Sequence, residues 1–415
     1  MPVPPDVSRN GYRPQAGYAS VRMQQGRLAT DADWNEQADL AGHAQRTLAM
    51  ALLGPHALAP FAPPDGFRVT AVAFDGERVR ATLLPGQYWV GGVPLDAPAP
   101  TTLALPLPDA VDATAPVTLL LVLDVRETDV DAFDDPAIAD PALSLQAPST
   151  RTRVEWTLRL VPAASPTDAG HEAPPPPRLR LGALPDGAGY GGLEHRLYRL
   201  QVLRGGEAGS AMPPTFAWSR DNASRWHAVQ AVAPGNAAGT WRVHLAPGGD
   251  GLRQPAPGQW VDWACPGDAP TALMQVLSAA GRTLELQAPP GATAHPPQRD
   301  ALRLRGWDHA GDPAHGGGVV AAAGCWLPLE DGLGAWFEPG GRFRTGDYWQ
   351  LAARASAATP YDDDAQRVAR PPDGPWRACA ALARLRLDAA TRSVDVDDLR
   401  MMLSLHRGPA SGAQP

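Results

Sequence analysis

The density of glycine and proline is the feature that most constrains how this chain can fold. Gly (42) and Pro (46) together make 88 of its 415 residues, whereas average usage is about 12%. Because both residue types interrupt regular structure, this density disfavours long helices and favours many short strands joined by turns. The 44% hydrophobic share is enough for more than one core. The sequence therefore predicts a mainly β, multi-domain protein with sandwich-like or barrel-like β structure.

One segment near the N-terminus instead predicts an amphipathic helix. Thr30 or Asp31 can cap its start, Asp33 places negative charge near the positive end of the helix dipole, and Gly54-Pro55 ends it at about Leu53. A spacing of four residues predicts one apolar stripe along it, made of Leu40, Ala44, Leu48 and Leu52.

The residues before this helix, 1–28, open with three prolines and are expected to form an extended arm. An arm and a single helix cannot close a core alone. They must therefore pack on the rest of the chain or on a partner, and we interpret residues 1–55 as an assembly anchor.

Strand patterns begin at Phe67, where apolar residues start to alternate. Two hairpins are predicted, Phe67–Phe74 with Arg78–Leu83 around Asp75-Gly76, and Gln87–Val90 with Val93–Leu95 around Gly91-Gly92. The apolar run Val117–Val125 predicts a central strand, and the alternating segment Thr152–Leu160 predicts a half-exposed strand beside it.

Composition divides the rest of the chain into further units. We expect a first β domain at 60–162, a proline-rich linker or long loop at 163–190 and a second β domain at 191–300. A third β block at 301–405 ends in a terminal helix over Ser393–Leu405, and a disordered tail follows at 406–415.

The charge and the cysteines limit the partners and the compartment. A net charge of −8 argues against nucleic-acid binding, which needs a surplus of positive charge. No uncharged apolar stretch reaches the roughly 20 residues of a membrane helix, so no membrane insertion is expected. Cys265, Cys325 and Cys379 lie far apart and are expected to be buried free thiols in a reducing compartment.

The first ten residues lack the apolar core of a secretory signal. We therefore expect synthesis in the cytoplasm without a signal peptide. If the protein acts outside the cell, we expect it to leave by another route, such as release of an assembled particle.

The sequence gives no positive sign of catalysis. It contains no G-x-S-x-G elbow and no P-loop. His309, Asp312 and His315 match no zinc spacing, and the acidic residues at 129–140 lack the spacing of a calcium loop, so we interpret them as a solvated loop. We expect no enzyme activity, no cofactor and no metal site.

The segment from Tyr18 to Glu36 holds the residues best suited to an interface. In Gln24-Gln25-Gly26-Arg27, two amides and a guanidinium surround a glycine that allows close backbone approach. Trp34 is a suitable interface anchor, although internal packing of this segment is the alternative. The candidate interface residues are Tyr18, Gln24, Gln25, Gly26, Arg27, Asp31, Asp33, Trp34, Asn35 and Glu36.

Two further motifs are interpreted as structural corners next to strands. The first places a charge pair and a turn-forming Asp-Asn after a strand, with Arg220 tied to backbone carbonyls or to an acidic side chain; a sugar contact is the minority alternative. The second is a turn that leads into a strand whose aromatic residues lie on opposite faces. The corner residues are Trp218, Arg220, Asp221 and Asn222 in the first, and Arg344, Asp347 and Trp349 in the second.

The N-terminal motif resembles an uncharacterised family associated with phage tails and extracellular contractile injection systems. The segment that carries the resemblance is QQGR followed by DADWNE, residues 24–36. Later blocks continue it as far as about Leu387, among them Thr150–Trp156, Phe216–Asn222, Leu327–Gly332 and Arg344–Trp349.

This resemblance implies a structural role in a phage-tail-like particle. The expected place is the baseplate periphery or the fibre-attachment site, and the expected partners are baseplate or fibre proteins. By analogy with tail fibres it also implies a homo-oligomer, with a trimer as the expected form. The alternatives are a carbohydrate-binding surface adhesin and a polysaccharide depolymerase of a tail fibre.

Overall fold

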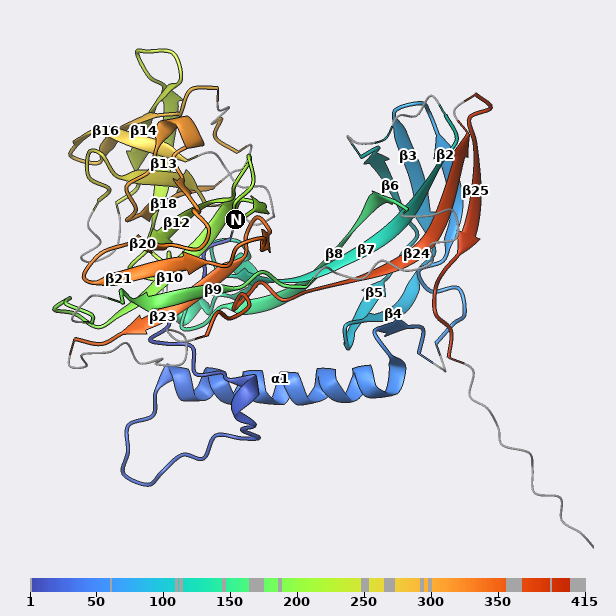
Figure 1. The fold of residues 1–415 in the computed structure, drawn as a ribbon, viewed down its shortest axis with the longest axis horizontal. Coiled ribbons are helices and arrows are strands. Elements are labelled where there is room, and N and C mark those ends of the chain that lie inside the picture. The colour runs from blue at the N-terminus through green and yellow to red at the C-terminus, as the bar shows by residue number, and fades with distance from the viewer. Residues whose placement is uncertain are drawn as a thin grey trace, which may run out of the picture.

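The chain folds into a mainly β structure with one α-helix near its start (Figure 1), as the sequence predicts. The computed structural model describes residues 2–59, 62–108, 111, 115–143, 147–163, 175–185, 189–247, 254–264, 273–291, 295–297, 301–355, 368–388 and 390–403. Among these residues, α1 (Asp31–Leu53) is the one α-helix, and short 3-10 turns lie at Pro14–Ala16, Pro136–Ile138, Pro141–Leu143 and Pro313–His315.

The first lobe is a β-sandwich. One layer is a four-stranded sheet in the order β25-β24-β7-β8, and it packs against two three-stranded sheets in the orders β2-β3-β6 and β1-β4-β5. The four-stranded sheet contains β7 (Val117–Val130), β8 (Arg151–Pro162), β24 (Arg377–Asp388) and β25 (Ser393–Asp398). The smaller sheets contain β1 (His56–Ala57), β2 (Val69–Phe74), β3 (Arg78–Leu83), β4 (Gly86–Val90), β5 (Val93–Ala97) and β6 (Thr101–Pro106).

The local predictions for this lobe are confirmed. β2 pairs with β3, β4 pairs with β5, and β7 lies between β24 and β8. Every second residue of β7 faces the sandwich core, namely Leu119, Leu121, Leu123 and Val125. Burial on both faces of the sheet explains why this strand is a continuous apolar run in the sequence.

The second lobe is built from sheets around a separate core. One sheet has the order β19-β12-β10-β23, a second has the order β20-β21-β9, and β11 pairs with β22. Their bounds are β9 Leu179–Ala183, β10 Arg196–Arg204, β11 Gly206–Glu207, β12 Thr215–Ser219, β19 Val319–Val320, β20 Trp326–Pro328, β21 Leu333–Phe337, β22 Arg342–Phe343 and β23 Tyr348–Ala353.

A closed six-stranded barrel is inserted into the second lobe between β12 and β19. The strands run in the order β13-β14-β17-β16-β15-β18 and enclose an apolar core that contains Trp263 and Met274. Their bounds are β13 Trp226–Pro234, β14 Thr240–Leu245, β15 Trp260–Trp263, β16 Met274–Ala280, β17 Thr283–Gln287 and β18 Leu302–Trp307. Closure leaves this sheet without exposed edges.

The sheets do not follow the order of the chain, which corrects the expected domain boundaries. β24 and β25, expected in a third block at 301–405, complete the first lobe by pairing with β7. The expected boundary between 191–300 and 301–405 separates β10 from its partner β23 and cuts off β18 from the barrel. The linker expected at 163–190 contains β9. Pairing between distant strands leaves no local signal.

Three smaller expectations are also wrong. Ser393–Asp398 forms a strand where we expected a terminal helix, because alternating Val and Asp side chains pair it with β24. Cys325 is exposed, although we expected a buried thiol, and Cys379 is half-buried. The acidic stretch is not a solvated loop, because Asp131 and Asp134 pair with the buried Arg303 at 2.5 and 2.6 Å. Cys265 and the tail at 406–415 lie outside the described residues.

Figure 1 shows the two lobes at opposite ends of the molecule, joined by the long strands β7, β8 and β24. The helix α1 lies along one side, with its start beneath the second lobe and its end beneath β4 and β5. One face of α1 therefore contacts the body of the protein and the other lies outside it.

Candidate functional site

The first residues of the chain are part of its own fold. We call residues 2–9 the N-terminal strap. Arg305 donates a hydrogen bond to the carbonyl oxygen of Pro2 at 2.9 Å, Val3 is buried, and Arg354 donates to the carbonyl oxygen of Ser8 at 3.0 Å. The start of the expected arm is thus held by its own chain, because its carbonyl groups meet guanidinium groups of the second lobe and the barrel.

The strap also holds the first turn of α1. Ser8 donates from its N–H and its hydroxyl to Asp31 at 2.8 and 2.7 Å, and Arg9 pairs with Asp33 at 3.1 Å. Burial opposes ionisation of Asp31, but the Ser8 hydrogen bonds outweigh it and hold the pKa of this carboxyl below its usual value. Thr30 is the N-cap and accepts a hydrogen bond from the N–H of Asp33, as predicted.

Residues 14–29, which we call the N-terminal loop, project from the molecule between the strap and α1 (Figure 1). All of them are exposed except the half-buried Val21, whose N–H donates to the side-chain oxygen of Gln37 at 2.8 Å. Large apolar side chains lie in solvent here: Tyr18 is 63%, Met23 59% and Leu28 86% exposed. In an isolated molecule this arrangement leaves apolar surface in contact with water.

The motif Gln24-Gln25-Gly26-Arg27 forms a tight turn in this loop. The N–H of Arg27 donates to the carbonyl oxygen of Gln24 at 3.3 Å, and Gly26 has a φ of +70°. A positive φ at this position of a turn favours glycine. A Cβ added to Gly26 would meet no atom within 4 Å, so the turn requires this glycine and the packing of the chain does not.

The outer face of α1 continues this exposed surface. Trp34 is 81%, Leu48 62% and Leu52 70% exposed, and Asn35 is exposed as well. Of the 23 residues of α1, only Ala32 and Leu40 are buried. The prediction that Leu40, Ala44, Leu48 and Leu52 form one apolar face is therefore wrong, because only Leu40 of these four is buried. A step of four residues advances by about 40° around a helix, so Leu52 has turned away from Leu40.

The inner face of α1 is held by polar and close backbone contacts. Arg46 pairs with Glu127 of β7, and its guanidinium lies 4.7 Å from the ring centre of Trp376. A Cβ on Gly92 would lie 2.5 Å from the carbonyl oxygen of Arg46, so only glycine permits this approach of the β4–β5 turn. Burial, with the charge of Glu127 adding to it, raises the pKa of Asp39 to about 6.

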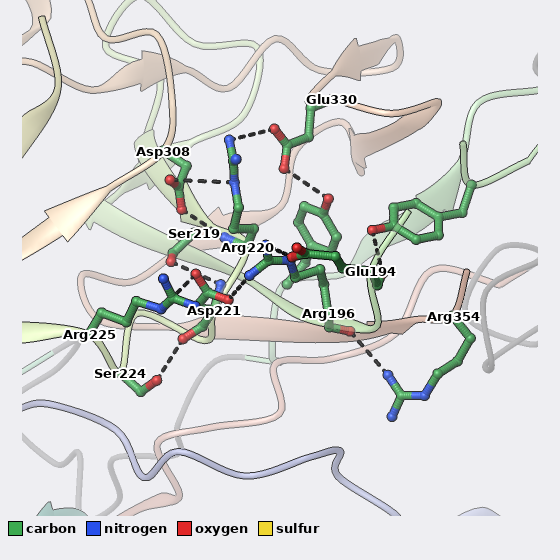
Figure 2. Close-up of polar contacts among 12 residues, drawn as sticks. Glu194, Arg196, Ser219, Arg220, Asp221, Ser224, Arg225, Asp308, Glu330 and Arg354 are labelled. Carbon is green, nitrogen blue, oxygen red and sulfur yellow. Dashed lines mark hydrogen bonds and ion pairs between the residues drawn. The ribbon is translucent and has the colours of Figure 1, made fainter. Parts of the chain in front are cut away.

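The first corner motif is a network of ion pairs beside β12 (Figure 2). Arg220 pairs with Glu330 at 2.7 Å, and its N–H donates to Asp308 at 2.9 Å. Tyr198 donates to the other oxygen of Glu330 at 2.8 Å. Burial, with the Tyr198 hydrogen bond and Arg220 opposing it, raises the pKa of Glu330. Asp308 follows β18 and Glu330 follows β20, so the contacts of Arg220 connect the end of β12 to both of these strands.

The rest of this motif makes the corner itself. Asp221 pairs with Arg196 and, at 3.0 Å, with Arg225 (Figure 2). Asn222 is buried, has a φ of +54°, and donates to the carbonyl oxygen of Pro5 in the strap. Trp218 is buried in the core of the second lobe. No side chain of this motif is presented to solvent as an aromatic platform for a sugar.

The second corner motif connects the two lobes. The N–H of Arg344 donates to Asp347 at 3.0 Å, and Asp347 pairs with Arg377 of β24 at 2.5 Å. Trp349 is fully buried and donates from its ring N–H to the carbonyl oxygen of Arg370 at 3.0 Å. Both corner motifs thus make contacts within the protein itself. The candidate interface residues that remain exposed are those of the N-terminal segment.

The candidate interface residues do not all lie together in one exposed patch. Tyr18, Trp34, Asn35 and the turn 24–27 face solvent. Asp31 and Asp33 face the strap, and the Glu36 side chain lies against the backbone at Gly11. Met23 and Leu28 were missed as candidates, although two isolated apolar residues in a polar loop are a signal that sequence reasoning can use.

Comparison with known families decides the affiliation of the chain. Residues 3–93 and 182–374 match DUF6519, which is described as a family of unknown function. This chain belongs to DUF6519. No curated protein and no solved structure matches it.

The two segments that match DUF6519 cover different parts of the structure. The first segment contains the strap, the N-terminal loop, α1 and strands β1 to β4, and the second contains the barrel and most of the second lobe. The long strands β7, β8 and β24 lie outside both segments. The exposed N-terminal surface is therefore part of what makes this chain a DUF6519 member.

Neither a metal centre nor a membrane span is found in the described part of the chain. There, no group of three or more His, Cys, Asp or Glu side chains is placed to hold a metal ion. His315 contacts Asp312 at 2.9 Å, while His309 is buried and bonded to Gly317. No described helix has the length and apolar character to cross a membrane.

Proposed function

We propose that this protein is a structural subunit of a phage-tail-like contractile injection particle, attached through its N-terminal loop to a baseplate or fibre protein. One observation carries the proposal. Tyr18, Met23 and Leu28 are presented to solvent on a loop whose flanking residues Ser8 and Asp31 are bonded to each other and whose Val21 is bonded to Gln37 of α1. Exposed apolar side chains on a held loop favour binding, because little conformational entropy is lost when the partner docks.

The chemistry of the loop indicates the kind of partner. Its turn exposes two amides and the guanidinium of Arg27, and Arg22 is exposed nearby. These groups fit a groove with an apolar floor and with carbonyl or carboxylate groups at its rim. The assignment to a tail-like particle rests on the sequence resemblance of residues 24–36, and the position at the baseplate periphery or fibre-attachment site is part of the same proposal.

The test replaces the three apolar loop residues together, as Tyr18→Ser, Met23→Ser and Leu28→Ser. Deletion of residues 1–53 would not test the loop alone, because it would also remove the strap, which is built into the fold. A matched control carries Leu193→Ser and Met212→Ser, which change apolar side chains that are 95% and 78% exposed on the second lobe. Both variants are produced in cells that assemble the particle, and the amount on purified particles is measured by quantitative mass spectrometry.

We expect the loop variant to keep the thermal unfolding midpoint of the wild type and to lose about tenfold or more of its occupancy, while the control stays at the wild-type level. Normal occupancy of the loop variant would overturn attachment through the loop. Absence of the wild-type protein from purified particles would overturn the particle assignment itself.

A further inference from the structure

The outer face of α1 has the spacing of a coiled-coil seam. Exposed residues recur at alternating intervals of four and three: Trp34, Ala38, Ala41, Gln45, Leu48 and Leu52. In heptad terms Trp34, Ala41 and Leu48 take d positions, and Ala38, Gln45 and Leu52 take a positions. A mean repeat of 3.5 residues keeps such a seam facing a second helix along its whole length. We call these six residues the α1 seam.

We infer that the α1 seam packs in parallel, in register, against the α1 seam of a second copy of this chain. This inference deepens the proposed function, because it names the occupant of the helical part of the N-terminal surface. It concerns the purified protein and does not depend on which particle the chain enters.

Charge is the first argument for a second copy. The residues that flank the seam are uncharged: Asn35, Gln37, Gly42, Ala44, Ala49 and Ala51. Three charged residues of the helix are engaged elsewhere, with Asp31 and Asp33 bonded to the strap and Arg46 paired with Glu127. The other two, Glu36 and Asp39, lie outside the seam and its flanking positions. Two identical seams can therefore meet without repulsion. A charged partner, such as a nucleic acid or a lipid headgroup, would find no counter-charge on this face.

Gln45 supplies the second argument, because it is the one polar residue of the seam. Against an apolar partner its amide would be buried without a hydrogen bond, at a cost in stability. In a parallel, in-register pair the Gln45 side chains of both copies lie at the same level and can bond to each other. A single polar residue at an a position fixes register in this way. An antiparallel pair would place Gln45 opposite Ala41 and leave it unsatisfied.

The small residues and the fixed position of α1 support the same arrangement. Ala38, Ala41 and Gly42 allow close approach of the two helix axes. Most of the stability of a helix in a protein comes from tertiary packing, and α1 is already held by the strap and by Arg46. Association therefore does not have to supply the free energy of helix formation.

The first experiment measures self-association of the purified full chain by sedimentation velocity, from about 1 to about 100 μM, where interfaces of modest size associate. The seam variant carries Leu48→Glu and Leu52→Glu. Its matched control, Thr47→Glu with Met50→Glu, puts the same two charges on exposed residues of α1 outside the seam. We expect the wild type and the control to associate and the seam variant to need at least about tenfold more protein. A wild type that stays monomeric, or a seam variant that associates equally well, would overturn the inference.

The second experiment tests the parallel register. Gln45→Cys and Thr47→Cys are made in a background with Cys325→Ser, since Cys325 is exposed. Under mild oxidation we expect Gln45→Cys to yield mostly disulfide-linked dimer and Thr47→Cys to yield little. Equal cross-linking at both positions would contradict the register. The loop variant Tyr18→Ser, Met23→Ser, Leu28→Ser should still self-associate, so failure of the attachment proposal and failure of this inference give different results.

Discussion

The side-chain amide of Asn222 donates a hydrogen bond to the carbonyl oxygen of Pro5 at 2.9 Å, which ties the start of the chain to a corner of the second lobe. The side-chain oxygen of Asn222 accepts a hydrogen bond from Gln350 at 2.7 Å. The backbone N–H of Asn222 donates to the carbonyl oxygen of Leu197 at 2.7 Å. Its φ of +54° is a conformation that asparagine tolerates better than most residues. Asn222 thus suits this position through both its backbone and its side chain.

Asn222→Ala should lower the free energy of unfolding by about 3 kcal/mol. Two buried hydrogen bonds contribute about 1 kcal/mol each, and alanine adds about 1 kcal/mol of backbone strain in the left-handed region. Asn222→Gly loses the same bonds without the strain and should cost about 1 kcal/mol less. Urea unfolding of both variants measures the difference. Equal midpoints for alanine and glycine would contradict the strain at this position.

Local patterns predicted the elements whose partners are near in sequence. The Asp75-Gly76 and Gly91-Gly92 turns fix the β2–β3 and β4–β5 hairpins, and the Thr30 cap fixes the start of α1. The pairing of β24 with β7 could not be predicted, because their registers join residues such as Arg377 and Arg126 that are distant in the chain. Such pairing depends on which apolar faces remain uncovered after local structure has formed.

For the candidate interface, the structure divides the predicted segment into exposed residues and residues bonded to the protein itself. Tyr18, Trp34 and the turn 24–27 are exposed, whereas the neighbouring Asp31 and Asp33 are bonded to the strap. The strap was not foreseen, because its partners Arg305 and Asn222 are ordinary surface residue types in the sequence. The predicted stripe follows a spacing of four from Leu40, whereas the proposed α1 seam follows alternating steps of four and three from Trp34.

A buried ion pair in the barrel gives the second prediction. Arg305 donates to both oxygens of Asp262 at 3.0 and 2.6 Å, and Trp307 donates to the same carboxylate at 3.2 Å. Asp262→Ala should destabilise the protein by about 3–5 kcal/mol, because it leaves a buried guanidinium without its counter-charge. The double variant Asp262→Leu, Arg305→Met should recover at least half of that loss. Urea unfolding checks both, and a double variant as unstable as Asp262→Ala would contradict this account.

Two carboxylates of α1 should respond to neutralisation with opposite signs. Burial and the charge of Glu127 raise the pKa of Asp39 to about 6, above the ordinary value of about 4. The folded state therefore binds this proton more tightly than the unfolded state, and ionisation of Asp39 lowers stability as the pH rises through 6. Asp39→Asn should stabilise the protein at pH 7.5 by no more than about 1 kcal/mol, since the burial of this side chain is only partial and water screens its charge, and the gain should vanish near pH 4.

Asp31 is the matched comparison, because hydrogen bonds from Ser8 hold its pKa below the usual value. Asp31→Asn should lower the thermal unfolding midpoint at pH 7.5, and the loss should shrink as the pH falls toward 3. Differential scanning calorimetry of both variants across this range measures the two trends. Shifts of the same sign at pH 7.5 would contradict the assignment of these charges.

His309 gives the last prediction, which concerns mild acid. This side chain is buried between Trp260 and Trp307, with ring centres 6.4 Å away in each case, and its Nε2–H donates to the carbonyl oxygen of Gly317 at 2.7 Å. Burial lowers the pKa of His309 to about 4, whereas an unfolded chain has a histidine pKa of about 6.5. The unfolded state therefore takes up the proton first, and stability is lost as the pH falls from 6.5 toward 4. The loss should approach about 2–3 kcal/mol at pH 4.

The variant His309→Gln keeps an amide N–H for Gly317, but it loses the buried ring, so its free energy of unfolding should be lower at pH 7. Because glutamine cannot ionise, this free energy should fall less between pH 7 and 4.5. Urea unfolding at several pH values compares the two proteins, and parallel curves would show that His309 does not carry this pH dependence.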